Sequence, residues 1–109
     1  MTTETFVEVG QYRPSIDVSP GFTLDYYFDW ADWCDLVSDS ISTKAVVGEG
    51  VTVNSSEIVA GVTEAGDAVA NSRVKVWLTD KTTEPAIVTC TIVTVGGRTD
   101  SRKFYLLDR

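Results

Sequence analysis

The sequence predicts an all-β fold, namely an immunoglobulin-like antiparallel β-sandwich of about seven strands with one short helical turn and an extended N-terminal arm. Three observations predict it. Valine and threonine, which favour strands, are abundant, whereas methionine, lysine and glutamine are scarce. Several segments alternate apolar and polar residues, as half-buried strands do. Turn residues separate these segments, and a chain of 109 residues has the size of one domain.

Residues 1–20 are expected to form the arm, and residues 21–109 the sandwich. Pro14 and Pro20 interrupt any long regular element within the arm, although residues 6–9 alternate like a strand. Its apolar side chains are too many for an idle tail, so we expect the arm to lie along a neighbouring molecule and to be dispensable for folding. The arm supplies four candidate interface residues, which are Phe6, Val7, Val9 and Tyr12.

The first strand of the sandwich is expected at residues 22–29. Phe22, Leu24, Tyr26 and Phe28 alternate there with polar residues, which is the pattern of a strand with one buried face. These four side chains are therefore expected to face the core.

A short helical turn is expected at residues 30–37, crossing one end of the sandwich. Trp30, Trp33, Cys34 and Val37 recur there at helical spacing. Asp29 directly precedes the turn, and its carboxylate can accept hydrogen bonds from unpaired backbone N–H groups. We therefore expect Asp29 to cap the turn.

The rest of the chain is expected to consist of short strands and turns. Strands are predicted at residues 41–47, 51–53, 58–62, 73–78, 86–95 and from 99 or 101 to 107. Turns or loops are predicted at residues 48–50, 54–56, 61–71, 80–85 and 96–97. The inward side chains predicted for the last three strands are Val74, Val76, Leu78, Val88, Cys90, Ile92, Phe104 and Leu106. The ten-residue run 86–95 is expected to be a central strand.

The two cysteines, Cys34 and Cys90, have two interpretations. They could form the inter-sheet bridge of many immunoglobulin domains, or they could be reduced, buried thiols. The start of the sequence lacks the basic and apolar regions of a secretory signal, which favours reduced thiols in a cytoplasm.

The composition argues against catalysis and against nucleic-acid binding. The chain contains no histidine, so the commonest general base and metal ligand is missing. No nucleophile elbow or phosphate-binding glycine loop occurs, and no cofactor is expected. A net charge of −7 repels phosphate backbones, and no apolar run is long enough for a bilayer.

A cluster of acidic residues has a structural and a metal-binding interpretation. Its members are Asp25, Asp29, Asp32, Asp35 and Asp39. Crowded carboxylates can hold calcium, but no calcium-binding loop with its glycine is present. We expect solvated or capping carboxylates, and calcium bound between copies remains the alternative.

Aromatic side chains on outward strand positions are the candidate contact residues of the sandwich. They are Tyr27, Trp77 and Tyr105, and exposed aromatic residues are enriched at protein interfaces. The alternative is that each ring is partly buried at an edge of the sandwich. Basic residues gather late in the chain, at Arg98, Arg102, Lys103 and Arg109, which suits contacts between oppositely charged ends of copies.

Three segments together carry a resemblance. They are Phe28-Asp29-Trp30-Ala31-Asp32-Trp33, then Val74-Lys75-Val76-Trp77-Leu78, and then Val88-Thr89-Cys90-Thr91-Ile92 leading to Gly97-Arg98-Thr99-Asp100-Ser101-Arg102-Lys103-Phe104. In this order, and over residues 20–107, the chain resembles small immunoglobulin-like virion structural or fibre proteins of tailed bacteriophages. It departs from them at the turn 80–85, where that group often carries extra glycines.

The resemblance implies a non-catalytic virion protein that is made in the host bacterial cytoplasm. Its expected role is capsid decoration, fibre anchoring or a collar component, attached in many copies to capsid, collar or tail proteins and forming a homo-oligomer. The alternative is an adhesion module that binds a host receptor or glycan. The predicted loop 61–71 has no aromatic residues, which favours the structural role.

Overall fold

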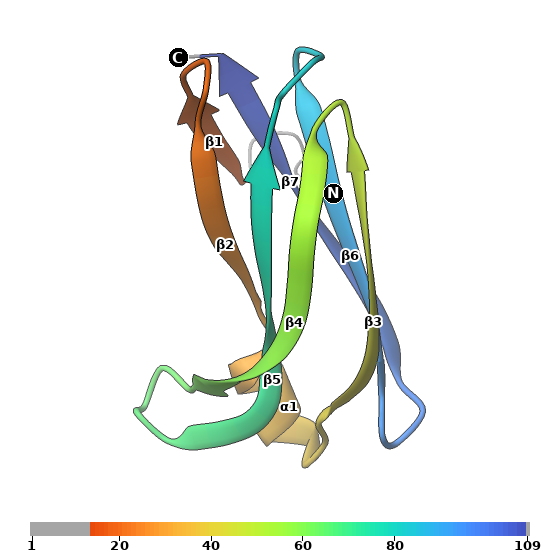
Figure 1. The fold of residues 1–109 in the computed structure, drawn as a ribbon. Coiled ribbons are helices and arrows are strands. Elements are labelled where there is room, and N and C mark those ends of the chain that lie inside the picture. Colours follow the sequence, from red (N-terminus) through yellow and green to blue (C-terminus); the bar gives the residue numbers. More distant parts are fainter. Residues whose placement is uncertain (1–13, 109) are drawn as a thin grey trace, which may run out of the picture.

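The computed structural model describes residues 14–108, in which seven strands form two sheets packed face to face (Figure 1). The elements are β1 (Ser15–Val18), β2 (Thr23–Asp29), α1 (Ala31–Val37), β3 (Ile41–Glu49), β4 (Thr52–Val62), β5 (Ala68–Thr79), β6 (Ala86–Thr94) and β7 (Thr99–Asp108). One sheet has the order β1-β7-β6-β3 and the other β2-β5-β4. The predicted all-β sandwich with one short helix is confirmed.

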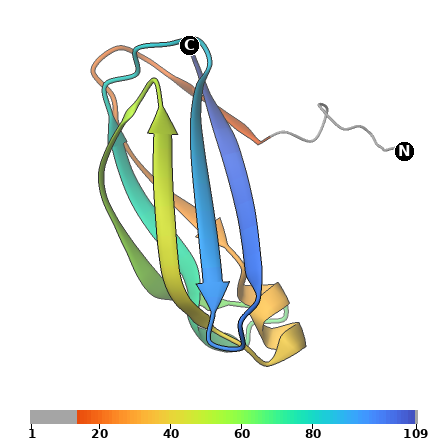
Figure 2. The same ribbon diagram turned by 90° about the vertical axis from the view of Figure 1, so that its right-hand side faces the viewer.

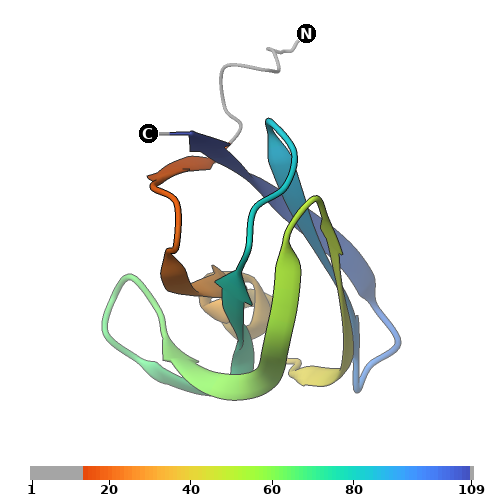
Figure 3. The same ribbon diagram turned by 45° about the horizontal axis from the view of Figure 1, so that its top comes forward.

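The topology is immunoglobulin-like. If β2 to β7 are matched to strands B to G, the sheets become B-E-D and G-F-C, the constant-type arrangement. The first strand, β1, lies beside β7 and pairs with it in parallel, whereas the other strand pairs are antiparallel. Figure 3 shows the two layers apart, with α1 behind them.

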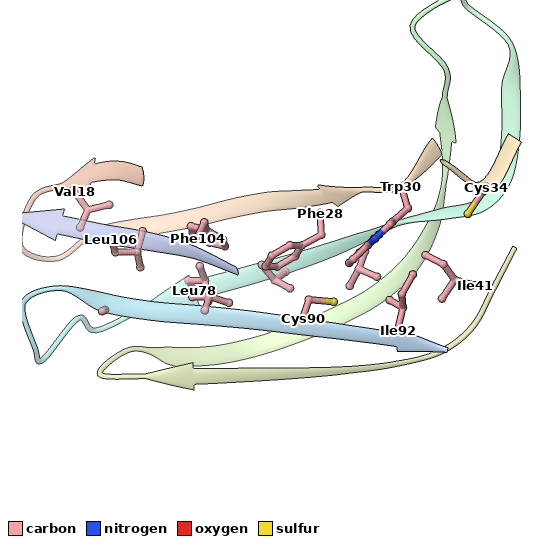
Figure 4. Close-up of a cluster of buried hydrophobic side chains, with 14 residues drawn as sticks. Val18, Phe28, Trp30, Cys34, Ile41, Leu78, Cys90, Ile92, Phe104 and Leu106 are labelled. Carbon is pink, nitrogen blue, oxygen red and sulfur yellow. The ribbon is translucent and has the colours of Figure 1, made fainter. Parts of the chain in front are cut away.

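The core lies between the sheets and consists of the inward residues of alternating strands (Figure 4). The eight inward side chains predicted for the last three strands have no exposed surface. Phe28 of β2 is buried too, and Phe22, Leu24 and Tyr26 pack against the cluster. Tyr26 stacks on Phe104, with ring centroids 3.9 Å apart. The predicted inward faces are confirmed, because a period of two places every second residue between the sheets.

Helix α1 closes one end of the sandwich, as predicted. Trp30, which precedes the helix, is 1% exposed, and its indole N–H donates to Asp100 Oδ2 at 2.8 Å. The Ala31 N–H donates to Asp29 Oδ1 at 2.9 Å, so Asp29 satisfies one free donor of the first turn. The helix ends at Val37, and the next residue, Ser38, caps it with a left-handed φ of 53°.

The hairpin formed by β4 and β5 is longer than predicted. The expected break at residues 54–56 is wrong, because β4 continues through it with a register shift between Val53 and Ser55. The expected loop 61–71 is also wrong at its ends, because the strands stop at Val62 and resume at Ala68. Pairing with the partner strand overrides the weak strand preference of these small polar residues. Figure 1 shows the far end of this hairpin bending away from the sandwich.

The last part of the predicted arm belongs to the sandwich. Residues Ser15–Val18 form β1 and pair with Tyr105–Asp108 of β7. Val18 is 7% exposed and joins the core cluster. Pro14 and Pro20 therefore bound a short edge strand, a position in which proline is tolerated. The candidate interface residues of the arm, Phe6, Val7, Val9 and Tyr12, lie outside the described residues.

Gly50 shapes the turn between β3 and β4. Its φ is 78°, and a Cβ atom here would lie 1.8 Å from the Thr83 hydroxyl oxygen. The Gly50 carbonyl accepts a hydrogen bond from the Thr82 N–H at 2.7 Å. Glycine therefore lets this turn approach the loop between β5 and β6.

Candidate interaction surfaces

The outer face of the β2-β5-β4 sheet carries two exposed aromatic rings. Tyr27 on β2 is 44% exposed and Trp77 on β5 is 38% exposed. In the register of these strands, Tyr27 lies opposite Lys75, and Trp77 is the next outward residue of β5. We call Tyr27, Lys75 and Trp77 the aromatic patch. The prediction that Tyr27 and Trp77 point outward is confirmed.

Lys75 connects the two rings of the aromatic patch. Its ammonium nitrogen lies 5.6 Å from the centroid of the Tyr27 ring and 5.3 Å from that of Trp77. At these distances an ammonium group is attracted by the faces of both rings. The three side chains therefore form one continuous surface in place of two separate rings.

Charged residues surround the aromatic patch. Asp25 lies opposite Trp77, and Glu57 of β4 lies opposite Lys75. Next along the sheet, Arg73 forms an ion pair with Asp29 at 3.1 Å. An aromatic centre with a charged rim is the usual composition of a protein–protein contact surface.

Tyr105 lies on the other sheet, so the predicted contact residues do not form one site. Its neighbours in β7, Phe104 and Leu106, point into the core, and Tyr105 therefore points outward. It is half-buried and lies opposite Ile87 of β6 and Ser15 of β1. The sandwich separates it from the aromatic patch.

Exposed valines on this second outer face were missed in the sequence prediction. Val47 of β3 is 56% exposed, and Val93 of β6 is 39% exposed. Val95, in the turn after β6, is exposed as well. The signal was present in residues 86–95, where β-branched residues occupy both faces of one strand.

The acidic residues near α1 serve as hydrogen-bond acceptors within the chain. Asp29 binds Arg73 and the Ala31 N–H, and Asp32 accepts a hydrogen bond from the Glu64 N–H at 2.9 Å. Across residues 14–108, no three acidic or cysteine side chains gather closely enough to hold a metal ion. Asp29 and Asp32 therefore connect α1 to β5 and to the turn after β4.

Asp39 joins the end of α1 to the turn between β6 and β7. Its carboxylate accepts hydrogen bonds from the N–H groups of Ser40 and Gly96 and from the Arg98 guanidinium at 2.8 to 3.0 Å. The Thr94 hydroxyl, followed by these donors, holds the pKa of Asp39 well below its ordinary value. The side chain is only 4% exposed, so solvent screens these contacts weakly.

Two of the basic residues near the C-terminus form contacts with other residues of the same chain. Arg98 is paired with Asp39. The Arg102 guanidinium lies 4.8 Å from the centroid of the Trp30 ring and donates to the Asp29 carbonyl. Lys103 is exposed on β7, and Arg109 lies outside the described residues. The basic residues therefore have separate partners and do not form one charged cluster.

Both cysteines are buried free thiols. The bridge of immunoglobulin domains joins strands B and F. Cys90 lies on β6, the equivalent of strand F, but Cys34 lies on α1 after the equivalent of strand B. Figure 4 shows Cys34 at the helix end of the core and Cys90 nearer its middle. Burial raises the pKa of both thiols, that of Cys90 to about 11.

A groove of about 310 Å³ lies at the opposite end, between the β1–β2 turn, the loop after β5 and the end of β7. Lys81, which lines this groove, is paired, because its ammonium binds Asp108 at 2.7 Å and Glu84 at 2.9 Å. The hydrogen bond that the Lys81 ammonium donates to the Asp108 carboxylate is the main cause that raises the pKa of Lys81. No helix among residues 14–108 is long and apolar enough to cross a membrane.

A sandwich with exposed aromatic and aliphatic side chains on two outer faces is typical of the class of small binding modules that contact other proteins. Residues 19–107 match a family model described as "Podophage GP4 fiber-tail adaptor protein gp77". The match covers most of the chain, which therefore belongs to this family of podophage fibre–tail adaptors. No curated protein matches the chain.

Membership in this family makes the chain a non-catalytic structural protein of the virion tail. The predicted resemblance to virion structural proteins of tailed phages is confirmed, and so is the expected localisation in the virion.

Proposed function

We propose that the chain is a passive connector that anchors a fibre to the podophage tail, in several copies, through contact surfaces on its two opposite sheets. The family match over residues 19–107 is the observation that carries this proposal. The family description names both a fibre and a tail, which favours fibre anchoring over capsid decoration or a collar role.

The two outer faces support a connector with two different partners. The aromatic patch lies on the β2-β5-β4 sheet, whereas Val47, Val93 and Tyr105 lie on the β1-β7-β6-β3 sheet. Because the core separates these faces, both can be occupied at the same time. Aromatic and aliphatic side chains that are already exposed can be buried against a partner without unfolding the sandwich.

Separate binding assays for the two partners test the proposal. The double variant Tyr27→Ala/Trp77→Ala removes the rings of the aromatic patch, and Val47→Asp/Val93→Asp places charges on the other face. Each variant is expected to lose binding to one partner, fibre or tail, by at least about tenfold, and to keep the other. The assays use purified fibre protein and tails that lack fibres, with binding followed by sedimentation.

Leu36→Ala is the control, because Leu36 is 82% exposed on α1 and lies off both faces. It is expected to bind both partners normally. If the unaltered chain bound neither fibre nor tail, or if both double variants lost the same partner, a two-faced connector would be ruled out.

A further inference from the structure

One edge of the four-stranded sheet is only half paired. Strand β7 spans Thr99–Asp108, but β1 pairs with Tyr105–Asp108 alone. Within residues 14–108, no strand pairs with β7 along residues 99–104 on the side away from β6. We call this segment the open edge of β7. Figure 2 shows β7 along this side of the molecule, with α1 beside the end at which the strand begins.

The backbone groups on the open edge can be identified from the register. The Thr94 N–H of β6 donates to the Arg98 carbonyl, so the backbone N–H and C=O groups of the even-numbered residues of β7 point toward β6. The Tyr105 N–H donates to the Pro14 carbonyl, so the backbone N–H and C=O groups of the odd-numbered residues point toward the side of β1. The N–H and C=O groups of Thr99, Ser101 and Lys103 therefore point out of the sheet, where a further strand can pair with them.

Pro14 explains why β1 does not continue along the open edge. In an extended parallel ladder, the Lys103 carbonyl would accept a hydrogen bond from the N–H of residue 14. Proline has no N–H, so this bond cannot form and the regular ladder stops at Ser15. The edge is left available to a strand from another molecule.

The two edge strands on the other side of the sandwich lie against each other. Strands β3 and β4 are consecutive and in contact. The Lys44 ammonium of β3 donates to the Ser56 hydroxyl of β4 at 2.6 Å, which links the two edges. A charged side chain that crosses an edge in this way hinders strand addition there.

Residues 1–13 have the properties of a strand for the open edge. They contain no proline, alternate at Phe6-Val7-Glu8-Val9, and join the sandwich at Pro14, beside Tyr105. Glu4 and Glu8 are opposite in charge to Lys103, which is exposed on β7 within the open edge. At about 3.3 Å per residue, a segment of this length is long enough to pair with all of residues 99–104.

We propose that the open edge of β7 binds residues 1–13 of a second copy as an added strand, so that copies associate head to tail. The contact is heterologous, since one copy supplies the segment and the next supplies the edge, and such contacts close into rings when the rotation permits. This inference rests on the part of the proposed function that places several copies on the particle.

Disulfide trapping between two full-length variants identifies the occupant. One variant carries Val7→Cys, and the other carries Ser101→Cys and a mass tag. Cys34 and Cys90 have no exposed surface and do not compete in folded protein. Under mild oxidation the mixture is expected to give the mixed disulfide dimer. Ser55→Cys, exposed on β4 of the other sheet, replaces Ser101→Cys as the control and is expected to give at least about tenfold less.

Proline substitution tests the edge itself. Ser101→Pro removes an N–H group that faces the open edge and leaves the β6–β7 hydrogen bonds in place. Ser101→Ala is the matched control, because it loses the same hydroxyl contact with Thr91 and keeps the N–H. In sedimentation, Ser101→Ala is expected to associate like the parent chain, and Ser101→Pro to remain monomeric.

Each contrary result overturns the inference in a distinct way. A chain that carries both Val7→Cys and Ser101→Cys and forms only an intramolecular disulfide would show that residues 1–13 pair with their own β7. Equal association of the Pro and Ala variants, or a monomeric parent chain, would show that the edge binds no second copy. If Ser101→Pro fails to fold, the trapping experiment decides alone.

Binding to fibre and to tails is measured on the same proteins. If the parent chain associates through the open edge but binds neither partner, the proposed function fails and this inference stands. If the parent chain binds both partners while the mixed disulfide dimer is absent, the inference fails and the proposed function stands.

Discussion

At the scale of single residues, Asp39 shows how one carboxylate holds together segments that lie far apart in the sequence. It accepts hydrogen bonds from the Ser40 N–H near the end of α1, from the Gly96 N–H in the turn between β6 and β7, and from the Arg98 guanidinium. These donors favour the ionised carboxylate, so the folded state has a lower pKa at this position than the unfolded chain. Protonation of Asp39 is therefore coupled to unfolding.

The first prediction is that Asp39→Asn lowers stability at neutral pH and weakens its dependence on acid. A group with a depressed pKa in the folded state contributes stability above its unfolded pKa of about 3.9, and this contribution is lost as the pH falls further. Urea unfolding from pH 7 down to pH 3 should show a steeper loss for the parent chain than for the variant. Asp35→Asn, on an exposed position of α1, serves as the control. Parallel profiles for Asp39→Asn and the parent chain would contradict the prediction.

A second residue-scale prediction concerns Trp30. Its ring is 1% exposed, contacts Phe28 and Arg102, and fills the helix end of the core. Trp30→Ala is expected to lower the free energy of unfolding by about 3–5 kcal/mol, because it leaves a large cavity. The exposed Leu36→Ala should change it by less than about 0.5 kcal/mol. Similar denaturation midpoints for the two variants would place Trp30 outside the core.

At the scale of elements, β1 is the strand whose role differs most from the sequence prediction. The whole segment 1–20 was expected to be dispensable, yet Ser15–Val18 pair with β7 and Val18 packs in the core. A parallel edge strand of four residues contributes few hydrogen bonds, but it covers one side of the sheet. Removal of β1 would expose that edge and the core beneath it.

Two truncations separate the strand from the segment before it. A chain that starts at Pro14 is expected to melt close to the full chain, whereas one that starts at Gly21 should melt at least about 4–8 °C lower, since the loss of even 1 kcal/mol has this effect in a domain of this size. Differential scanning calorimetry of both provides the measurement. Equal melting temperatures for the two truncated chains would mean that β1 adds nothing to folding.

At the scale of the whole molecule, many charged side chains pair within the chain, whereas the exposed aromatic and aliphatic side chains lie on the two outer faces of the sandwich. The ion pairs near α1 and beside the groove form between residues of the same chain, while the aromatic patch and the exposed valines lie on opposite faces. The net charge of −7 keeps such a surface soluble before assembly. This combination suits a protein that connects two larger structures.

The closed core predicts slow thiol chemistry. Cys34 and Cys90 have no exposed surface, and burial raises the pKa of each thiol, so the reactive thiolate is scarce in the folded state. Alkylation at pH 8 without reductant should label both thiols in denatured protein and proceed at least about a hundredfold more slowly in native protein. Mass spectrometry counts the labels. Denatured protein without any label would demonstrate a disulfide.

Much of the fold and part of the site could be predicted from local patterns. Alternation located β2, β6, β7 and the second half of β5, together with their inward faces, because one buried face imposes a period of two. The same alternation placed Tyr27 and Trp77 outside. Two strands could not be predicted from this alternation. Small polar residues hid the continuity of β4, and flanking prolines hid β1, because both strands depend on partners that are distant in the sequence.

By itself, the sequence determined the class of fold and the inward and outward residues of most strands, since these follow from local periodicity and residue type. The resemblance to virion structural proteins came separately, from the order of particular segments in the chain. Only the tertiary structure decided which side chains meet. It joined Tyr27 to Trp77 through Lys75, placed Tyr105 on the opposite sheet, and paired Asp39 with Arg98. These outcomes depend on strand order and register, which arise from contacts between distant parts of the chain and leave no periodic signal in the sequence.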